Sequence, residues 1–302
     1  MNLQDFKYLN DNLQAAGIFG SDASVANMFL LQEKYNTELK IRENVLIRYY
    51  YGDENRTGYA FPLFLKKDIP LKQALEIIFD DAAQQKRPVS FCLITQEQKR
   101  ELDLCLAEHF QGRHVEWKTN RDDCDYIYLR ENLAGLLGSR YQKKRNHISR
   151  FNRIYGTNWE FKLYPQNDIA DDILAVSQKW YNEKDGELKE VLRLEYESIQ
   201  KALDNTQLLG LIGGVLYING EPAAMTLAAP ISADVLDVIY EKAVAEHEKN
   251  GAYAVINQQF ARKGPQSLYY NREEDMGVEG LRKAKLSYKP DMILDKFYGR
   301  VE

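Results

Sequence analysis

Cysteine and histidine are scarce in this sequence. The 302 residues include three cysteines and four histidines, and neither type recurs at the spacing of a zinc site. Cys92, Cys105 and Cys124 are odd in number and form no CxxC pair. We therefore expect no disulfide framework and no bound metal, and we expect the reducing cytoplasm as the compartment.

Long apolar runs are also missing. The longest nearly unbroken one, Leu208 to Ile218, is far shorter than the roughly 20 residues that cross a bilayer. The first residues, MNLQDFKYLN, lack the basic and apolar segments of a secretory signal. We expect neither a signal peptide nor a transmembrane segment, which leaves peripheral membrane contact open.

Several catalytic motifs are absent. The sequence contains no GxSxG, HExxH, GxxxxGK[ST] or GxGxxG, which argues against metal hydrolases and nucleoside triphosphatases. A net charge of -5 and a pI near 5.6 argue against a broad nucleic-acid surface. Without low-complexity tracts, the chain is expected to fold throughout, as one large domain or two of about 150 residues.

The second half has a clear element pattern. Asn219-Gly220 between two apolar runs is a strong hairpin signal, because both positions of such a turn need positive φ. The periodicity around it predicts the order β-α-α-β-β-β-α-β-α-β. The expected elements are strands at Trp159–Pro165, Val235–Val244, Ser267–Asn271 and Met292–Tyr298, and helices at Ile169–Glu183, Glu195–Asn205, Ala252–Lys263 and Val278–Tyr288.

The first half repeats this pattern more loosely. Residues 1–132 are expected to form one unit, residues 133–156 a basic joining helix, and residues 157–302 a second unit. The first unit is predicted to hold helices at Ser24–Tyr35, Leu71–Gln84 and Gln96–Ala107, and strands at Glu38–Arg42, Val45–Tyr51, Gly58–Leu65, Val89–Ile94, Val115–Lys118 and Tyr126–Leu129.

The element order of the second half is similar to that of GNAT acyltransferases. In addition, SRYQKKRNHISRF, YEKA, INQQFA and YYNREEDMGVEGLRKAKLSYKP resemble the C-terminal domain of bacterial phosphatidylglycerol lysyltransferases and their soluble relatives. More distantly, the chain resembles the Fem-type peptidyltransferases. The resemblance implies an α/β (α+β) fold class with tandem GNAT-like domains, each a mixed, mostly antiparallel sheet flanked by helices.

The resemblance also implies an acyltransferase. Such an enzyme moves an acyl or aminoacyl group to an amine or hydroxyl, with aminoacyl-tRNA or acyl-CoA as donor, a small molecule or lipid as acceptor, and no further cofactor. The loop AEHEKNGAY makes acetyl-CoA a poorer fit, because Glu246 and Glu248 would repel a pyrophosphate. The alternative is a non-catalytic GNAT-fold protein that binds a small anionic ligand.

The site is expected where a GNAT-like sheet splays, between the strand ending at Glu241 and the strand ending at Asn271. Acyl transfer needs a base, polarisation of the carbonyl and an acid for the leaving group. Candidate catalytic residues are Glu274, Glu241, Asp275 and Tyr288, and candidate substrate-binding residues are Arg272, Arg282, Lys285 and Asn271. The competing interpretation is structural: Asp275 as a helix N-cap, Tyr288 as a core residue and the helix as a solvated, salt-bridged surface.

The joining helix is basic. It places apolar residues on one stripe and cations around the rest, which suits either a solubilising helix or a platform for tRNA phosphates or acidic headgroups. The candidate polyanion-binding residues are Arg140, Lys143, Lys144 and Arg145.

Overall fold

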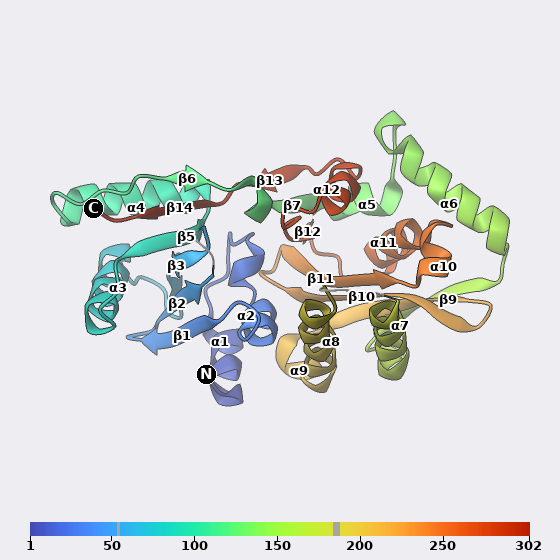
Figure 1. The fold of residues 1–302 in the computed structure, drawn as a ribbon, viewed down its shortest axis with the longest axis horizontal. Coiled ribbons are helices and arrows are strands. Elements are labelled where there is room, and N and C mark those ends of the chain that lie inside the picture. Colours follow the sequence, from blue (N-terminus) through green and yellow to red (C-terminus); the bar gives the residue numbers. More distant parts are fainter. Residues whose placement is uncertain (53–54, 184–187) are drawn as a thin grey trace. The chain divides into compact units, whose positions relative to one another are not determined.

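The structure is a computed structural model that describes residues 1–52, 55–183 and 188–302. The chain forms two compact units, each built on a mixed sheet with flanking helices (Figure 1). Unit 1 comprises Met1–Asp125, Glu274–Glu279 and Ile293–Glu302, and unit 2 comprises Tyr126–Glu273 and Gly280–Met292.

Unit 1 is organised around the sheet β1-β2-β3-β5-β14-β6, with β4 paired to β2. Its strands are β1 (Thr37–Arg42), β2 (Val45–Tyr51), β3 (Thr57–Tyr59), β4 (Leu63–Phe64), β5 (Ser90–Ile94), β6 (Lys118–Thr119) and β14 (Phe297–Arg300). Its helices are α1 (Leu3–Asn12), α2 (Val25–Leu31), α3 (Leu71–Gln84) and α4 (Gln96–His109), with short 3-10 turns at Ser21–Ala23 and Arg121–Asp123. Apolar residues of α3 and α4 pack on the sheet and form the core.

Unit 2 is organised around the sheet β7-β12-β11-β10-β9-β8, with β13 following β7 at the edge. The strands are β7 (Asp125–Leu129), β8 (Trp159–Tyr164), β9 (Ile212–Ile218), β10 (Glu221–Pro230), β11 (Val235–Ala243), β12 (Tyr269–Asn271) and β13 (Met292–Leu294). The helices are α5 (Arg130–Gly135), α6 (Gln142–Tyr155), α7 (Ala170–Asn182), α8 (Leu188–Asp204), α9 (Thr206–Leu209), α10 (Ala245–Glu248), α11 (Ala252–Lys263) and α12 (Glu279–Leu286).

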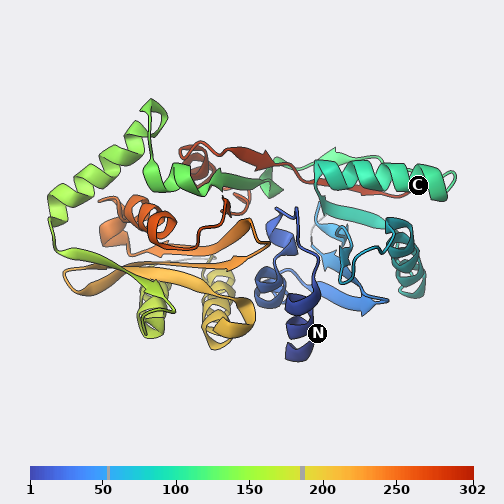
Figure 2. The same ribbon diagram turned by 180° about the vertical axis from the view of Figure 1, so that it is seen from behind.

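Two helical layers cover the sheet of unit 2. Helices α7 and α8 lie on one face, and α11 lies on the other together with α5 and α6 (Figures 1 and 2). The predicted hairpin is confirmed: Asn219 and Gly220 have φ of 53° and 84° and join β9 to β10. The hairpin supplies β10, which pairs with β11 along its length.

The expected division of the chain is wrong at two strands. Tyr126–Leu129, expected in the first unit, pairs as β7 with β12 in the sheet of unit 2. The predicted last strand, Met292–Tyr298, splits into β13 and β14, and β14 pairs with β5 and β6 in unit 1. Periodicity predicts that a segment forms a strand, but pairing partners depend on contacts distant in sequence.

The predicted joining helix is not continuous. Leu136 ends α5 in the left-handed region with φ 48°, and Gly138 follows with φ 82°. A 3-10 turn at Ser139–Tyr141 then leads into α6. The guanidinium of Arg145 donates to the carbonyl oxygens of Leu136 and Gly138, which satisfies groups that the end of α5 leaves open.

Candidate functional site

The strands β11 and β12 separate in unit 2. They pair in parallel only from Val235 to Asp237 and from Tyr269 to Asn271, after which β12 ends and β11 continues to Ala243. A bulge on β11 follows at once, because Leu227 and Ala228 of β10 face Tyr240 and Val238, which leaves Ile239 as an extra residue. The splayed strand pair expected from the sequence is therefore present.

An ion pair spans this splay. Nη2 of Arg272, the residue after β12, lies 2.9 Å from Oε1 of Glu241 on β11. Nδ2 of Asn257, on α11, lies 3.4 Å from Oε2 of the same carboxylate. Both charged side chains are largely buried, at 13% and 12% exposure. Burial opposes the charge of Arg272, but the neighbouring Glu241 outweighs it and keeps the pKa of Arg272 above its ordinary value.

Two tyrosines and a lysine complete the surroundings of Arg272. Its guanidinium carbon lies 4.9 Å from the ring centre of Tyr288 and 5.8 Å from that of Tyr128. Nζ of Lys144, on α6, lies 3.6 Å from the centre of the Tyr288 ring. Cations over aromatic faces are stabilised by the ring quadrupole. Segments from α6, β7, β11, α11 and α12 thus meet at one place.

Lys144 is a cation without a carboxylate of its own. Within the described residues its ammonium has no hydrogen bond and no ion pair. Burial, and next to it the charge of Arg272, lower the pKa of Lys144 to about 8, against the opposing effect of Glu241. Lys144 can therefore exchange a proton near neutral pH, and the cluster holds two cationic side chains against one carboxylate.

Three buried polar atoms around Glu241 have no hydrogen-bond partner among the described residues. They are Nη1 of Arg272, Oδ1 of Asn257 and Oγ1 of Thr226. Thr226 lies directly opposite Glu241 in the register of β10 and β11. Buried polar atoms are nearly always paired, since an unpaired one costs about 1–3 kcal/mol. Unpaired donors and acceptors gathered beside a splayed strand pair are typical of a ligand site.

Two of the predicted catalytic residues lie elsewhere, in unit 1. Glu274 pairs with Arg56, with 3.0 Å between its Oε1 and Nη2 of the arginine. Asp275 is fully buried, and its Oδ1 accepts the N–H of Gly277 at 3.0 Å in the turn ahead of α12. The prediction assumed an extended chain after Arg272, but Glu273 has φ 55° and turns it.

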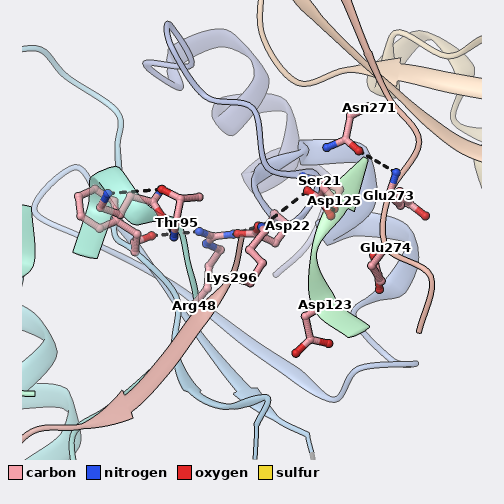
Figure 3. Close-up of polar contacts among 12 residues, drawn as sticks. Ser21, Asp22, Arg48, Thr95, Asp123, Asp125, Asn271, Glu273, Glu274 and Lys296 are labelled. Atoms are coloured by element: carbon pink, nitrogen blue, oxygen red, sulfur yellow. Dashed lines mark hydrogen bonds and ion pairs between the residues drawn. The ribbon is translucent and has the colours of Figure 1, made fainter. Parts of the chain in front are cut away.

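Among the predicted binding residues, two hold the backbone of unit 2. The side chain of Asn271 accepts the N–H of Glu273 at 2.7 Å, as Figure 3 shows. Nζ of the buried Lys285 donates to the carbonyl oxygens of Arg272 and Glu273. Arg282 is half-buried on α12. Lys285 and Asn271 thus fix the turn that places Arg272.

The four candidate polyanion-binding residues have different surroundings. Arg140 and Lys143 are exposed, Arg145 is committed to the carbonyls beside α5, and Lys144 belongs to the cluster with Arg272. Sequence reasoning grouped Lys144 with the other cations of the helix and did not single out Thr226, Asn257 or Tyr128. The three consecutive amides of INQQFA, Asn257 to Gln259, between apolar residues were the available signal for Asn257.

Two N–H groups of the loop after β11 already have acceptors. The carboxylate of Glu183 accepts the N–H of Ala245 at 2.9 Å, and the N–H of Gly251 donates to the Glu248 carbonyl at 3.0 Å. A phosphate-binding loop instead leaves several N–H groups for the anion.

Unit 1 contains a separate buried charge cluster that the sequence did not indicate. Asp22 contacts both Arg48 and Lys296, and Ser21 donates to Asp125 (Figure 3). Burial opposes ionisation of Asp22, but Lys296 and Arg48 outweigh it and hold its pKa below the ordinary value. Because these acids and bases pair with one another, the cluster is structural. In the part of the chain that the structure describes, no set of His, Cys, Asp or Glu residues could hold a metal ion.

The fold and the splayed strands define a class by architecture: tandem units, each a mixed sheet flanked by helices, with a splayed parallel strand pair in the second. A profile of the phosphatidylglycerol lysyltransferase C-terminal family matches residues 15–299, and the chain belongs to this family. The recognition made from the sequence is confirmed. Across the described residues, no helix has both the length and the apolarity needed to cross a membrane.

Solved structures share this fold. A conserved protein of unknown function from Bacteroides thetaiotaomicron VPI-5482 shares 31% identity, with coverage of 100% of this chain and 98% of that one and a TM-score of 0.87. The C-terminal domain (DUF2156) of a putative lysylphosphatidylglycerol synthetase from Agrobacterium fabrum has 15% identity, 99% and 92% coverage and a TM-score of 0.63. L-PGS from Bacillus licheniformis has 15% identity, 99% and 90% coverage and a TM-score of 0.61.

A more distant relative is an uncharacterised protein of Mycoplasmoides gallisepticum. It is 21% identical over 237 residues, which is 75% of each chain.

Proposed function

We propose that this protein transfers an aminoacyl group from an activated ester, such as aminoacyl-tRNA, to an amine or hydroxyl acceptor. Family membership supports an acyltransferase with a donor and an acceptor. The observation that carries the proposal is the unpartnered Nη1 of Arg272, held beside Glu241 where the strands separate. A fixed, buried donor of this kind can stabilise the oxyanion that forms when an ester carbonyl is attacked.

Residues around Arg272 are assigned the other roles in transfer: orienting the guanidinium, moving a proton and binding the amine of the aminoacyl group. Glu241 orients the guanidinium through its 2.9 Å contact, and Asn257 holds the other carboxylate oxygen. Lys144, with a pKa of about 8, accepts the proton of the attacking amine or hydroxyl when it is neutral. As the new amide or ester bond forms and the old ester C–O bond breaks, the protonated Lys144 returns that proton to the leaving oxygen. Asn257 Oδ1 and Thr226 Oγ1 are acceptors for the free amine that an aminoacyl group carries and an acetyl group lacks.

The loop beside α11 favours an aminoacyl ester over coenzyme A. Glu183 occupies the N–H of Ala245, and the remaining loop carries Glu246 and Glu248. These carboxylates oppose a pyrophosphate. We also propose the cytoplasm as the compartment, since Cys92, Cys105 and Cys124 are free thiols in the structure and aminoacyl-tRNA is made there.

The test is transfer of a radiolabelled amino acid from charged tRNA to amine, hydroxyl and phospholipid acceptors. Arg272→Lys keeps the positive charge but removes the second guanidinium nitrogen, Nη1. We expect kcat to fall about 100-fold, as when a donor to an oxyanion is lost. Arg100→Lys, an exposed arginine on α4, is the control and should be fully active.

The rival interpretation, a binding protein for a small anion, predicts a different result. Thermal shift would then show stabilisation by small carboxylates or phosphates and none by a non-hydrolysable aminoacyl-tRNA mimic. That pattern, together with no transfer to any acceptor class, would overturn the proposed function.

A further inference from the structure

One stretch of this acidic chain is purely basic. Residues 136–156 contain six Lys or Arg and no Asp or Glu, whereas the whole chain has 45 acidic against 40 basic residues. The stretch forms the turn after α5 and the whole of α6. Two of the six cations are committed: Lys144 to the cluster with Arg272, and Arg145 to the carbonyls of Leu136 and Gly138.

The other four cations point to solvent. Arg140, Lys143, Arg150 and Arg153 are all exposed. On α6, the buried Phe151 and its neighbours Ile148 and Tyr155 form the packed stripe. At about 100° per residue, the three exposed cations of α6 fall within roughly 80° of one another, away from that stripe. One face of α6 is therefore cationic along its length.

An apolar residue stands at the start of this face. Leu137 is 79% exposed, the largest exposure among the large apolar side chains that the structure describes. It lies between Leu136, buried with φ 48°, and Gly138 with φ 82°. The hydrogen bonds from Arg145 to the carbonyls of these two flanking residues brace the turn. Leu137 is thus held outward by a fixed backbone.

The cations also raise the local potential. Burial lowers the pKa of His147, and the charges of Lys144 and Arg150 lower it further. Carboxylates act near both ends of α6: after burial, Asp291 helps to raise the pKa of Tyr141, just before the helix, and Tyr155 near its end hydrogen-bonds His247 at 2.8 Å. Within the described residues, none of the four exposed cations forms an ion pair with a carboxylate. Their charge is therefore open to a partner.

We propose that Leu137 and the cationic face of α6 form a docking surface for an anionic phospholipid bilayer. Bilayer binding combines a few inserted apolar side chains with electrostatic attraction to the headgroups. Binding to a nucleic-acid backbone needs the cations but gains nothing from an exposed leucine. The exposed Leu137 therefore favours a bilayer over a nucleic acid as the partner. The turn at Leu137 is expected to insert into the headgroup region.

The expected affinity is modest and sensitive to salt. Four cations attract the anionic headgroups, and the attraction falls off within about a Debye length. Insertion of Leu137 adds burial of apolar surface.

The experiment measures co-flotation of the intact protein with vesicles of phosphatidylcholine, with and without phosphatidylserine. Phosphatidylserine is anionic but is not phosphatidylglycerol, the lipid after which the family is named. The assay therefore does not depend on the proposed transfer reaction. We expect binding only to the anionic vesicles, with loss at high salt. Lys143→Gln with Arg150→Gln should weaken it about 30-fold, and Lys66→Gln with Lys67→Gln, exposed in unit 1, should not.

The leucine separates bilayer binding from RNA binding. Leu137→Ala should weaken vesicle binding about tenfold, whereas Leu268→Ala, 51% exposed elsewhere in unit 2, should leave it unchanged. The pKa of His147, followed by NMR, should rise when vesicles are added. Equal vesicle binding by Leu137→Ala and the parent, or charge-dependent binding to an unstructured RNA with no binding to vesicles, would overturn the proposal.

Discussion

Nη2 of Arg272 lies 2.9 Å from Oε1 of Glu241, at the point where β12 has ended and β11 continues without it. The carboxylate uses one arm of the guanidinium, and the second arm, Nη1, is buried without a partner among the described residues. The pair therefore fixes a cation in the splay and leaves one donor for a ligand.

Removing Arg272 from the ion pair with Glu241 should lower the stability of the protein. Arg272→Met leaves Glu241 buried without its cation, and we expect the free energy of unfolding to fall by about 2–4 kcal/mol, measured by urea denaturation. Arg272→Met combined with Glu241→Leu should recover most of that loss. If the double variant is as unstable as the sum of the single ones, the two side chains are not coupled.

Lys144 should make stability depend on pH. Its folded pKa, about 8, is below the ordinary lysine value, so between pH 8 and about 10.5 the unfolded chain binds more protons. Stability of the parent therefore rises across that window. Lys144→Met removes the buried charge and should be at least as stable as the parent at pH 7, with the advantage shrinking as pH rises.

Thermal melts of both proteins at several pH values measure this difference, with the exposed Lys143→Met as control. A stability difference between Lys144→Met and the parent that is constant from pH 7 to pH 10.5 would show that Lys144 is not desolvated.

Local patterns were sufficient where the structure depends on neighbours in sequence. The Asn219-Gly220 turn and the strands that it joins formed as predicted, because the turn needs only the conformations of its own residues. The predicted strand order also placed Glu241 and Arg272 near the splay, since Glu241 lies near the end of β11 and Arg272 directly follows β12.

The remaining errors arise from long-range pairing and from single dihedral angles. No local signal says that β7 joins unit 2 or that β14 returns to unit 1. The positive φ of Glu273 removes Glu274 from the site, although the two residues lie within a few positions of Arg272. Lys144 reaches Tyr288 only because α6 packs on the same face of the sheet as α11.

Lys285 should be a structural cation that supports the site. Its Nζ donates to the carbonyls of Arg272 and Glu273, and it is only 7% exposed. Lys285→Met leaves two strand-end carbonyls unsatisfied and should lower the free energy of unfolding by about 2–3 kcal/mol, measured by urea denaturation. Lys283→Met, exposed on the same helix, should change it by less than about 0.5 kcal/mol. Equal effects would mean that the backbone turn holds without Lys285.

Gly251 should control the seating of α6. It has φ 104°, and a Cβ there would lie 2.8 Å from the carbonyl oxygen of His147 on α6. Gly251→Ala should therefore displace α6 and expose Lys144, moving the pKa of Lys144 toward its ordinary value, as competitive amine labelling with mass spectrometry would detect. Gly156→Ala, also at positive φ but with open space around it, should leave that pKa in place. An unchanged labelling profile in Gly251→Ala would show that α6 keeps its position without this contact.

The loop beside α11 makes a prediction about the acyl donor. The carboxylate of Glu183 accepts the N–H of Ala245 at 2.9 Å, so an incoming pyrophosphate would have to displace one anion while approaching Glu246 and Glu248. We expect coenzyme A and acetyl-CoA to give no thermal shift at millimolar concentration. Combining Glu183→Gln, Glu246→Gln and Glu248→Gln removes the repulsion and should produce measurable coenzyme A binding if the loop backbone can still accept phosphate. Tight binding of coenzyme A by the parent would mean that the Glu183 contact opens readily and that the donor is a thioester, whereas failure of both proteins to bind would mean that the loop backbone itself is unsuited to phosphate.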